Sequence, residues 1–173
     1  MNEKQSFLII YHKHKDLVYN LCMNYLQNRE DAEEVFQDVF LSVHQKIVLF
    51  EGKAKVKTWL YRITVNKSLD FIKARKAKKR FAFFKMASID DLEISGRIDH
   101  PGIILENKES TERILEAMNS LPANQKTALV LKSMEQLSQK EIAEVMKKDV
   151  KAVESLLSRA RKNLKEKLSK TKD

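Results

Sequence analysis

Glycine, proline and cysteine are scarce in this chain of 173 residues, which contains three glycines, two prolines and a single cysteine, Cys22. So few turn-forming residues argue against sandwiches and barrels of β-strands, which need many tight turns. One cysteine excludes an internal disulfide, and no cluster of Cys and His has the spacing of a zinc site. The composition therefore predicts an all-α protein of a reducing compartment, the cytoplasm, without a cofactor.

Long apolar runs are also absent. No stretch approaches the ~18 apolar residues that cross a bilayer, and the start of the chain lacks the basic and apolar parts of a signal peptide. Hydrophobic residues nevertheless make up 43% of the sequence and charged residues 33%. These shares are enough for a folded core, with more charge than the roughly 25% of an average domain. We expect a soluble chain of one domain or two small ones.

The charge is unevenly distributed. The formal net charge is +9, and it comes from two basic segments, 51–85 and 122–173, that are separated by an acidic one, 86–121. Two basic segments favour a polyanion, such as nucleic acid, that contacts two bodies. The acidic segment contains glycine and proline but no sustained apolar period, which is typical of a linker. We predict two small helical domains, 1–82 and 112–173, joined by a flexible linker at 83–111.

Apolar residues recur every three or four positions in the first half of the chain. This period predicts helices over about residues 3–26, 29–48 and 57–79, which can close a small bundle. Asn28 is a plausible N-cap of the second helix, because acidic residues follow it in the first turn.

The second helix has a polar face opposite its apolar stripe. Acidic and amide side chains and one leucine occupy this face and the preceding turn: Asp31, Glu34, Gln37, Asp38 and Leu41. An apolar residue beside carboxylates suits a basic, partly apolar partner, although a plain solvated face has the same pattern. Metal binding by the carboxylates, as in helical phosphohydrolases, needs a second carboxylate pair, which the neighbouring helices do not offer.

The loop near residue 53 and the third helix form the most basic part of the sequence. Cations that could follow a phosphate backbone alternate there with aromatic and amide side chains able to contact bases: Lys53, Lys55, Lys57, Trp59, Tyr61, Arg62, Asn66, Lys73 and Arg75. A basic tract, defined as residues 73–80, holds six cations in eight positions. Trp59 has a competing role in the core, because it lies beside apolar Leu60.

The last part of the chain has the pattern of a helix-turn-helix. Leu121 and Pro122 interrupt one helix, and Ser138 followed by Glu141 forms a capping box that starts another. After a turn at 147–149 a final helix runs over about 150–168. Its exposed face, together with the cap, supplies candidate DNA contacts: Ser138, Lys151, Glu154, Ser155, Ser158, Arg159 and Lys162. A plain helical hairpin is the alternative.

Taken in order, these motifs resemble the extracytoplasmic-function (ECF) group of bacterial sigma factors in the sigma-70 family. The resemblance is carried by five short segments, 31–40, 58–63, 121–122, 141–143 and 153–160. It implies a dissociable initiation subunit without catalysis or a small-molecule substrate, which directs core RNA polymerase to promoter DNA. It also suggests an anti-sigma factor as a partner.

The resemblance assigns a role to each surface. The face around Asp38 falls on the segment that docks on the clamp helices of the polymerase largest subunit, within a region 2 domain at 1–82. The basic loop and third helix fall on the part that melts the minus-ten element. The helix-turn-helix falls on region 4, at 112–173, which reads the minus-thirty-five element.

Two positions depart from the family pattern. Family members commonly have Gly in place of Lys147 and often Arg in place of Leu156. Two other function classes compete with a sigma factor. A helix-turn-helix repressor or activator acting without core polymerase leaves the basic aromatic third helix unexplained. A metal-dependent phosphohydrolase explains neither DNA-like region.

Overall fold

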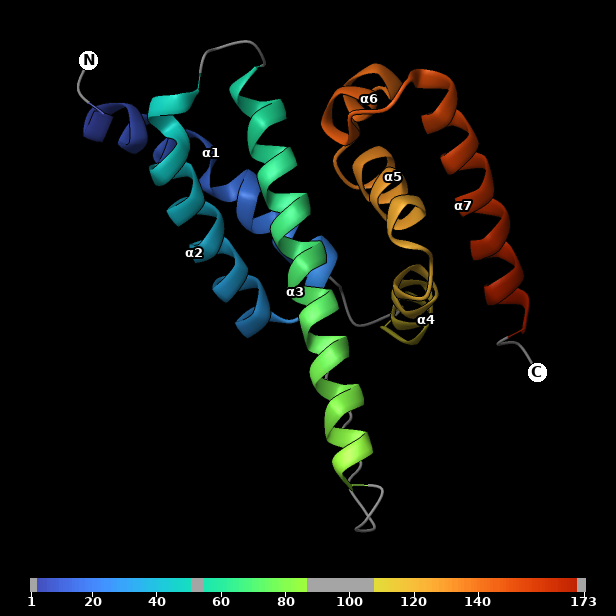
Figure 1. The fold of residues 1–173 in the computed structure, drawn as a ribbon. Coiled ribbons are helices and arrows are strands. Elements are labelled where there is room, and N and C mark those ends of the chain that lie inside the picture. Colours follow the sequence, from blue (N-terminus) through green and yellow to red (C-terminus); the bar gives the residue numbers. More distant parts are fainter. Residues whose placement is uncertain (1–2, 51–54, 87–107, 171–173) are drawn as a thin grey trace. The chain divides into compact units, whose positions relative to one another are not determined.

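The computed structural model describes residues 3–50, 55–86 and 108–170, and within these ranges all regular structure is helical (Figure 1). The elements are α1 Glu3–Leu26, α2 Arg29–Lys46, the 3₁₀ helix η1 Ile47–Leu49, α3 Val56–Met86, α4 Lys108–Asn119, α5 Ala123–Ser133, α6 Gln139–Met146 and α7 Val150–Lys170. The chain forms two compact units. The all-α prediction is confirmed.

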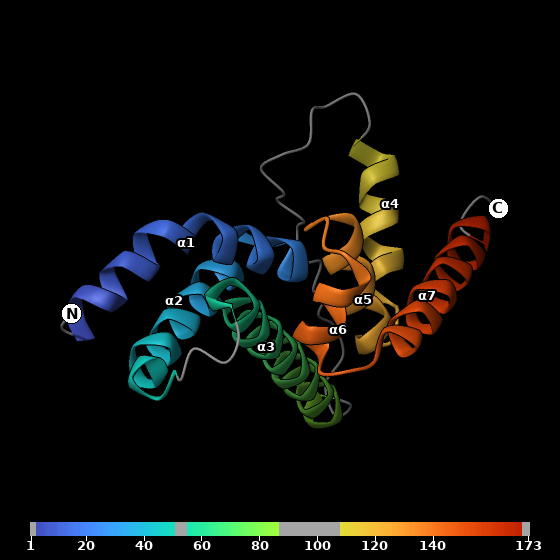
Figure 2. The ribbon, with the colours of Figure 1, turned by 90° about the horizontal axis from the view of Figure 1, so that it is seen from above.

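The first unit contains α1, α2, η1 and α3 from Ile63 onward. Gln27 ends α1 with a left-handed φ of 57°, and the Asn28 side chain then accepts a hydrogen bond from the Asp31 backbone N–H at 3.0 Å. The predicted N-cap is thus confirmed, and it turns the chain so that α2 packs along α1 (Figure 2). The α-helix α2 ends at Lys46 instead of the predicted 48, because the backbone tightens into η1.

The core of the first unit lies between α1, α2 and α3. Its fully or almost fully buried side chains include Val18, Leu21, Cys22, Tyr25, Val35, Val39, Val43 and Val65. At one end, the rings of Phe7, Tyr11, Phe36 and Phe40 meet mostly edge to face. Burial raises the pKa of the Cys22 thiol to about 12. This cysteine is therefore a core side chain.

The helix α3 is longer than predicted. It continues to Met86 instead of ending near residue 79. Lysine, arginine and alanine dominate its second half, and these residues have high helix propensity with no glycine or proline to stop the helix. The apolar period on which the prediction depended is lost before the helix ends.

The second unit contains the first residues of α3, Val56–Arg62, together with α4, α5, α6 and α7. Pro122 separates α4 from α5, as predicted. The side chains that α5, α6 and α7 bury most completely include Ala128, Val130, Leu131, Ile142, Val153, Leu157 and Ala160. Together α5, α6 and α7 form the predicted helix-turn-helix core. Within the described ranges, no helix combines the length and apolarity needed to span a bilayer.

Candidate functional site

The outer face of α2 carries the predicted acidic surface. Glu34, Gln37, Asp38 and Leu41 are all exposed, and Leu41 is 61% exposed. The buried stripe of the same helix consists of other residues, Ala32, Val35, Val39, Phe40, Ser42 and Val43. The four exposed side chains therefore have no packing role in the core of the unit. An exposed large apolar side chain beside carboxylates remains available to a partner.

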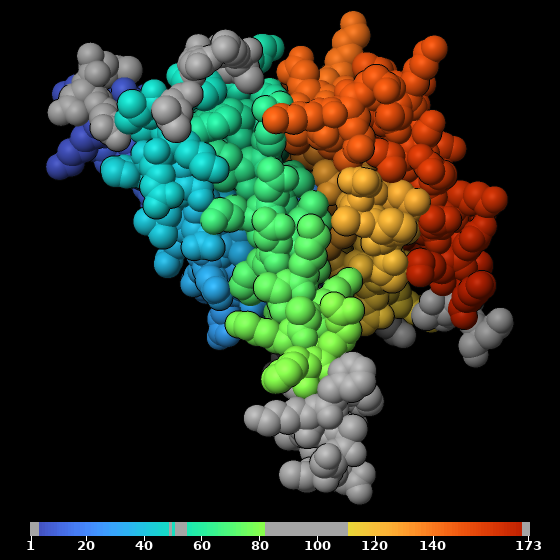
Figure 3. Space-filling model, in the orientation of Figure 1, coloured from blue at the N-terminus to red at the C-terminus, as the bar shows by residue number. Residues whose placement is uncertain are grey.

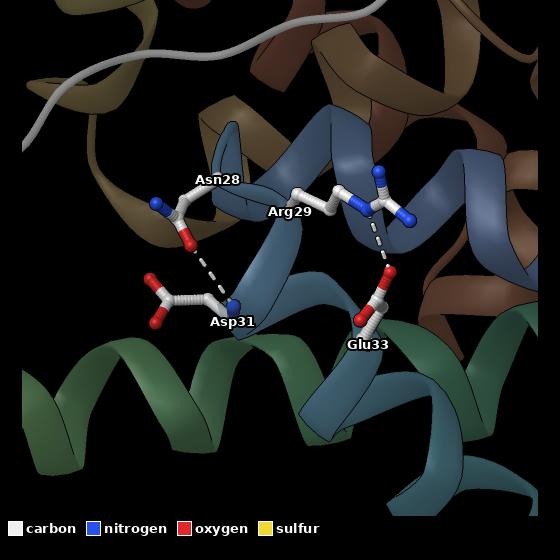
Figure 4. Close-up of polar contacts among 4 residues, drawn as sticks. All are labelled: Asn28, Arg29, Asp31 and Glu33. Atoms are coloured by element: carbon white, nitrogen blue, oxygen red, sulfur yellow. Dashed lines mark hydrogen bonds and ion pairs between the residues drawn. The ribbon is translucent and has the colours of Figure 1, made fainter.

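Asp31 belongs to a different environment from the rest of this set. Its side chain is 18% exposed and forms an ion pair with Arg75 of α3. Figure 4 shows its backbone N–H at the Asn28 side chain, with its carboxylate directed away from Arg29. The pair joins the first turn of α2 to α3. Asp31 is therefore engaged by α3 and not by the exposed acidic surface, and the pair links residues of two different predicted sites.

A second ion pair joins two residues within the first turns of α2. The Arg29 guanidinium donates to the Glu33 carboxylate at 2.8 Å, one helical turn away (Figure 4). The carboxylate raises the pKa of Arg29. Over the described ranges, no group of three or more His, Cys, Asp or Glu side chains could hold a metal ion. The chelating arrangement of Asp31, Glu34 and Asp38 that a phosphohydrolase would need has no support there.

The basic side of α3 is partly open and partly engaged. Lys55 and Lys57 are exposed, as are Asn66 and Lys73, while Trp59 is half-buried. Lys53 lies outside the described residues. The Lys73 ammonium lies 3.7 Å from the Asp70 carboxylate, so Asp70 pairs with a cation.

Tyr61 and Arg62 are held by protein groups within the second unit. Tyr61 is 3% exposed, and its hydroxyl donates to Glu135 at 3.0 Å. Burial, followed by the Glu135 carboxylate, raises the pKa of this phenol. Arg62 donates to the carbonyl of Glu144 at 2.7 Å and to that of Val145 at 3.4 Å. The expectation that the Tyr61 ring is open for stacking does not hold in this structure, because the ring is packed away from solvent.

The final helix presents the predicted polar face. Lys151, Glu154, Ser155, Ser158, Arg159 and Lys162 are exposed. Four of them, Glu154, Ser155, Ser158 and Arg159, line an open pocket on α7. The Arg159 Nε donates to the Ser155 carbonyl at 3.2 Å, so the guanidinium stays close to the helix. The opposite face is buried through Val153, Leu156, Leu157 and Ala160, which fixes how α7 is turned on its unit.

Ser138 caps α6 as predicted. Its hydroxyl accepts from the Glu141 backbone N–H at 3.3 Å, and the Glu141 carboxylate accepts from the Ser138 backbone N–H at 2.9 Å. The hydroxyl also donates to that carboxylate at 2.8 Å. The bonds from Ser138 lower the pKa of Glu141. Asp149 caps α7 in the same way, by accepting from Ala152 N–H at 2.7 Å. Sequence reasoning missed this second cap, although an aspartate directly before a helix is its usual signal.

The structure accounts for both departures from the family pattern. Lys147 has φ 52° and ψ 49°, so this lysine adopts the left-handed conformation that favours glycine. In the turn that results, Lys148 N–H bonds the Ala143 carbonyl at 3.0 Å. Leu156 is 9% exposed and packs in the core. The exposed residues of α7 are therefore neighbours of Leu156 in the sequence, and Leu156 itself is not among them.

Two family descriptions match the chain, in this order. Sigma-70 region 2 matches residues 10–78, and Sigma-70 region 4 matches residues 111–164. The ECF RNA polymerase sigma factor SigW of Bacillus subtilis is 29% identical over 170 residues, covering 96% of this chain and 90% of that protein. The ECF RNA polymerase sigma-E factor of Haemophilus influenzae is 27% identical over 169 residues, covering 96% of this chain and 89% of that protein.

Two solved structures share the fold. CnrH, solved in complex with the cytosolic domain of CnrY, has a TM-score of 0.65 at 22% identity and covers 96% of this chain and 89% of its own. The sigma factor RpoE of Bartonella quintana, solved with the anti-sigma factor NepR, has a TM-score of 0.63 at 20% identity and covers 96% of both chains.

Proposed function

The chain belongs to the ECF group of the sigma-70 family, and from this premise we propose how its surfaces divide the work of promoter-directed initiation. It is an initiation subunit of RNA polymerase without catalysis of its own, and it directs promoter recognition. The observation that carries this function is the order of the two matches, region 2 before region 4, on two helical units. We place the region 2 domain at 1–82, the linker at 83–111 and the region 4 domain at 112–173.

The acidic surface of α2 binds core polymerase in this proposal. Glu34, Gln37, Asp38 and Leu41 contact the clamp helices of the largest subunit. Exposure, negative charge and the absence of a core role support this assignment. Asp31 contributes indirectly, because its ion pair with Arg75 joins α2 to the basic helix. We assign Asp31 to positioning at this interface.

Two basic regions contact different elements of the promoter in this proposal. Lys53, Lys55, Lys57, Trp59, Asn66, Lys73 and Arg75 serve the minus-ten element, where contacts to phosphates and unstacked bases stabilise an open strand. Tyr61 and Arg62 do not belong to this set, because Glu135 and the carbonyls of Glu144 and Val145 hold their polar groups within the second unit. The exposed face of α7, with the Ser138 cap that fixes the preceding helix, reads the minus-thirty-five element in the major groove.

An anti-sigma factor is a further proposed partner. Both solved relatives were captured with a binding protein, NepR for RpoE and the cytosolic domain of CnrY for CnrH. We propose that this chain is restrained in the same manner and acts in the cytoplasm, where RNA polymerase acts. An exposed leucine beside carboxylates on α2 is a surface for which such a regulator and polymerase could compete.

The polymerase surface can be tested by reversing one charge. In Asp38→Arg, a cation replaces an exposed carboxylate, and folding should change by no more than about 0.5 kcal/mol at such a surface site. Core-polymerase affinity, measured by pull-down and fluorescence titration, should fall by at least about tenfold, because a charge is reversed at an interface. Glu166→Arg, the same change on exposed Glu166 of α7, should retain affinity. Full affinity in a folded Asp38→Arg protein would reject this surface.

The alternative, a repressor or activator that acts without core polymerase, is tested by measuring how the free protein binds promoter DNA. Each reader is small, and a flexible linker gives only a modest effective concentration of one reader relative to the other unless polymerase fixes their spacing. The free protein should therefore bind promoter DNA weakly, and the holoenzyme should bind it specifically. Tight and sequence-specific binding by the free protein would favour the repressor.

A further inference from the structure

The helix α3 changes character near Lys73. Before this point it buries Ile63, Thr64, Val65 and Ser68 in the first unit. From Lys73 to Phe81, every side chain is exposed, and Phe81 reaches 72%, the highest exposure of any large hydrophobic side chain that the structure describes. In Figures 1 and 3 this light-green part of α3 extends past the first turn of α2. Residues 73–81 therefore have no packing role in the core of their unit.

The exposed part of α3 coincides with the basic tract, 73–80. Two of the six cations have carboxylate partners, Arg75 with Asp31 and Lys73 with Asp70. The other four form no ion pair with any residue that the structure describes: Lys76, Lys78, Lys79 and Arg80. The sequence from 71 to 89 contains no acidic residue. The tract therefore carries a concentrated positive charge, which the carboxylates of the described residues compensate at only two positions.

An apolar stripe runs along the basic tract. Ala74, Ala77 and Phe81 are related as i, i+3 and i+7, so they lie on one face of the helix, and all three are exposed. The sequence adds two more aromatic residues to the same helix, Phe83 and Phe84. A contact with phosphates alone would use the cations and leave the apolar stripe in water. The pattern therefore favours a partner that is both anionic and apolar.

Cations border this stripe on both sides. Helical spacing of three or four residues places Lys73 and Arg80 beside Ala77 on one edge and Lys78 beside Phe81 on the other. The long stems of lysine and arginine can lie along an apolar surface while their charged ends reach outward. A helix that exposes an aromatic residue between cations is typical of segments that lie in the interface of an anionic membrane.

We propose that residues 73–81 of α3 bind the surface of an anionic phospholipid membrane. The cations contact the lipid phosphates, and the ring of Phe81 inserts between the acyl chains just below the headgroups. Each cation near such a surface strengthens binding about fivefold at low salt, and burial of the ring adds a contribution that salt does not screen. An anionic membrane is favoured over nucleic acid and over an acidic peptide, because it offers closely spaced phosphates directly beside an apolar layer. The inference concerns the free protein and does not depend on the assigned promoter contacts.

The first test measures binding of the full chain to vesicles in the absence of polymerase. Wild-type protein should sediment with vesicles of phosphatidylglycerol and phosphatidylcholine but not with vesicles of phosphatidylcholine alone. Phe81→Ser should weaken binding to the anionic vesicles about tenfold, because the inserted ring is lost. The matched control is Ile9→Ser, which changes an exposed apolar residue of the same unit outside the tract and should bind like wild type. No binding by wild type, or equal binding by Phe81→Ser, would overturn the inference.

The second test removes charge from the borders of the stripe. Lys78→Ala/Arg80→Ala should weaken binding to the anionic vesicles roughly thirtyfold at low salt, since two surface cations are lost. Lys13→Ala/Lys15→Ala removes the same charge from exposed positions of α1 and should retain most of the affinity. Circular dichroism checks that all variants are folded. Equal weakening by the two pairs would mean that net charge alone attracts the protein, which would overturn the inference.

A third test asks whether the side chain at position 81 enters the lipid. In Phe81→Trp a second tryptophan joins Trp59, which is the single tryptophan of the wild-type chain. On anionic vesicles the added emission should shift to shorter wavelengths and be quenched by brominated acyl chains, whereas wild-type emission should change little. Added emission that is neither shifted nor quenched would place the ring in water and overturn the inference.

The remaining outcomes separate a membrane from other polyanions. Phe81→Ser and wild type should be equal in holoenzyme binding to promoter DNA and in binding of the free protein to polyglutamate. If Phe81→Ser weakens either of these as much as vesicle binding, the stripe serves DNA or an acidic protein surface, and the inference is overturned. Failed vesicle binding with normal promoter recognition rejects the inference alone, whereas failure to form a promoter-specific holoenzyme rejects the proposed function.

Discussion

The helices α3 and α7 are both basic, but their relation to the core is different. In α7 one face is buried through Val153, Leu156, Leu157 and Ala160, and the polar face is exposed. In the basic tract of α3 every side chain is exposed. A helix with one buried face holds its outer side chains in a fixed direction, which base reading needs. A helix that is exposed all round can neutralise phosphates but cannot impose a direction on its side chains.

The largest expected effect tests whether a core face orients α7. Leu156→Arg places a cation at a position that is 9% exposed and should destabilise the protein by roughly 3 kcal/mol, since a buried charge without a partner is costly. Ala77→Arg, at an exposed position of the basic tract, should change stability by no more than about 0.5 kcal/mol. Urea denaturation measures both. Equal stability of the two variants would contradict the claim that α7 has a buried face and that the basic tract of α3 has none.

The next effect concerns base reading. Arg159 is exposed on α7, in the pocket that it lines with Glu154, Ser155 and Ser158. Arg159→Ala should cost ~1 to 3 kcal/mol of discrimination at one base pair of the minus-thirty-five element, because an arginine contact with a guanine edge is lost. Competition binding of holoenzyme with single-base variants of the element measures this loss. A uniform loss over all sequences would instead assign Arg159 to phosphate.

The counterpart on the α3 side is the triple change Lys53→Ala, Lys55→Ala and Lys57→Ala. This protein should retain upstream recognition and open the promoter poorly, since these cations are assigned to the melted strand. Permanganate footprinting of thymines in holoenzyme complexes compares it with Arg159→Ala. Normal opening by the triple variant together with failed opening by Arg159→Ala would reverse the two assignments.

A smaller effect is expected at the cap of α6. Ser138→Ala removes the hydroxyl that accepts the Glu141 N–H and should cost about 1 kcal/mol of stability. Ser155→Ala is the control, because Ser155 lies inside α7 and is exposed. Thermal and urea unfolding measure both. A cost for Ser155→Ala equal to that for Ser138→Ala would mean that capping does not explain the loss.

The same cap predicts a pH dependence. Bonds from Ser138 lower the pKa of Glu141 from its ordinary value of 4.5 in the folded protein. The stabilisation is therefore present above pH 4.5 and is lost as the pH falls through the lower folded value. Glu141→Gln should remove this part of the acid dependence, as seen in urea midpoints between neutral pH and pH 3. An unchanged profile would exclude a contribution from Glu141.

The smallest effect is expected at the turn between α6 and α7. Lys147 has φ 52°, a conformation that glycine adopts without steric cost. Lys147→Gly should stabilise the protein by about 0.5 kcal/mol, because relief of strain exceeds the added freedom of the unfolded chain. Lys148 lacks a positive φ, and Lys148→Gly should give no gain. Loss of stability in Lys147→Gly would show that the lysine side chain stabilises this turn.

Local sequence patterns predicted much of the fold. The apolar period gave the helices of both units, Asn28 and Ser138 marked two helix starts, and Pro122 marked a break. These signals work because caps and helix faces involve residues within four positions of one another. The end of α3 was predicted too early, because an apolar period stops where a helix leaves the core, whereas its backbone hydrogen bonds continue on propensity alone.

Only part of the candidate site could be predicted from the sequence. Exposure of Glu34, Gln37 and Asp38 on α2, and of Ser158 and Arg159 on α7, follows from the helical period. Burial of Leu156 follows from the same period once its buried neighbours are known. The engagement of Tyr61 by Glu135 has no local signal, because 74 residues separate them.

The sequence by itself determined that this protein is helical, that its charge lies in two basic parts, and that its second part carries a helix-turn-helix. Only the tertiary structure decided that Asp31 pairs with Arg75 and so is not part of the exposed acidic surface. It also decided that Tyr61 is buried and that every side chain of the basic tract of α3 is exposed. The physical reason is the range of the interactions. Helix period and capping act between neighbours in the chain, whereas pairing and burial depend on which helices the fold brings together.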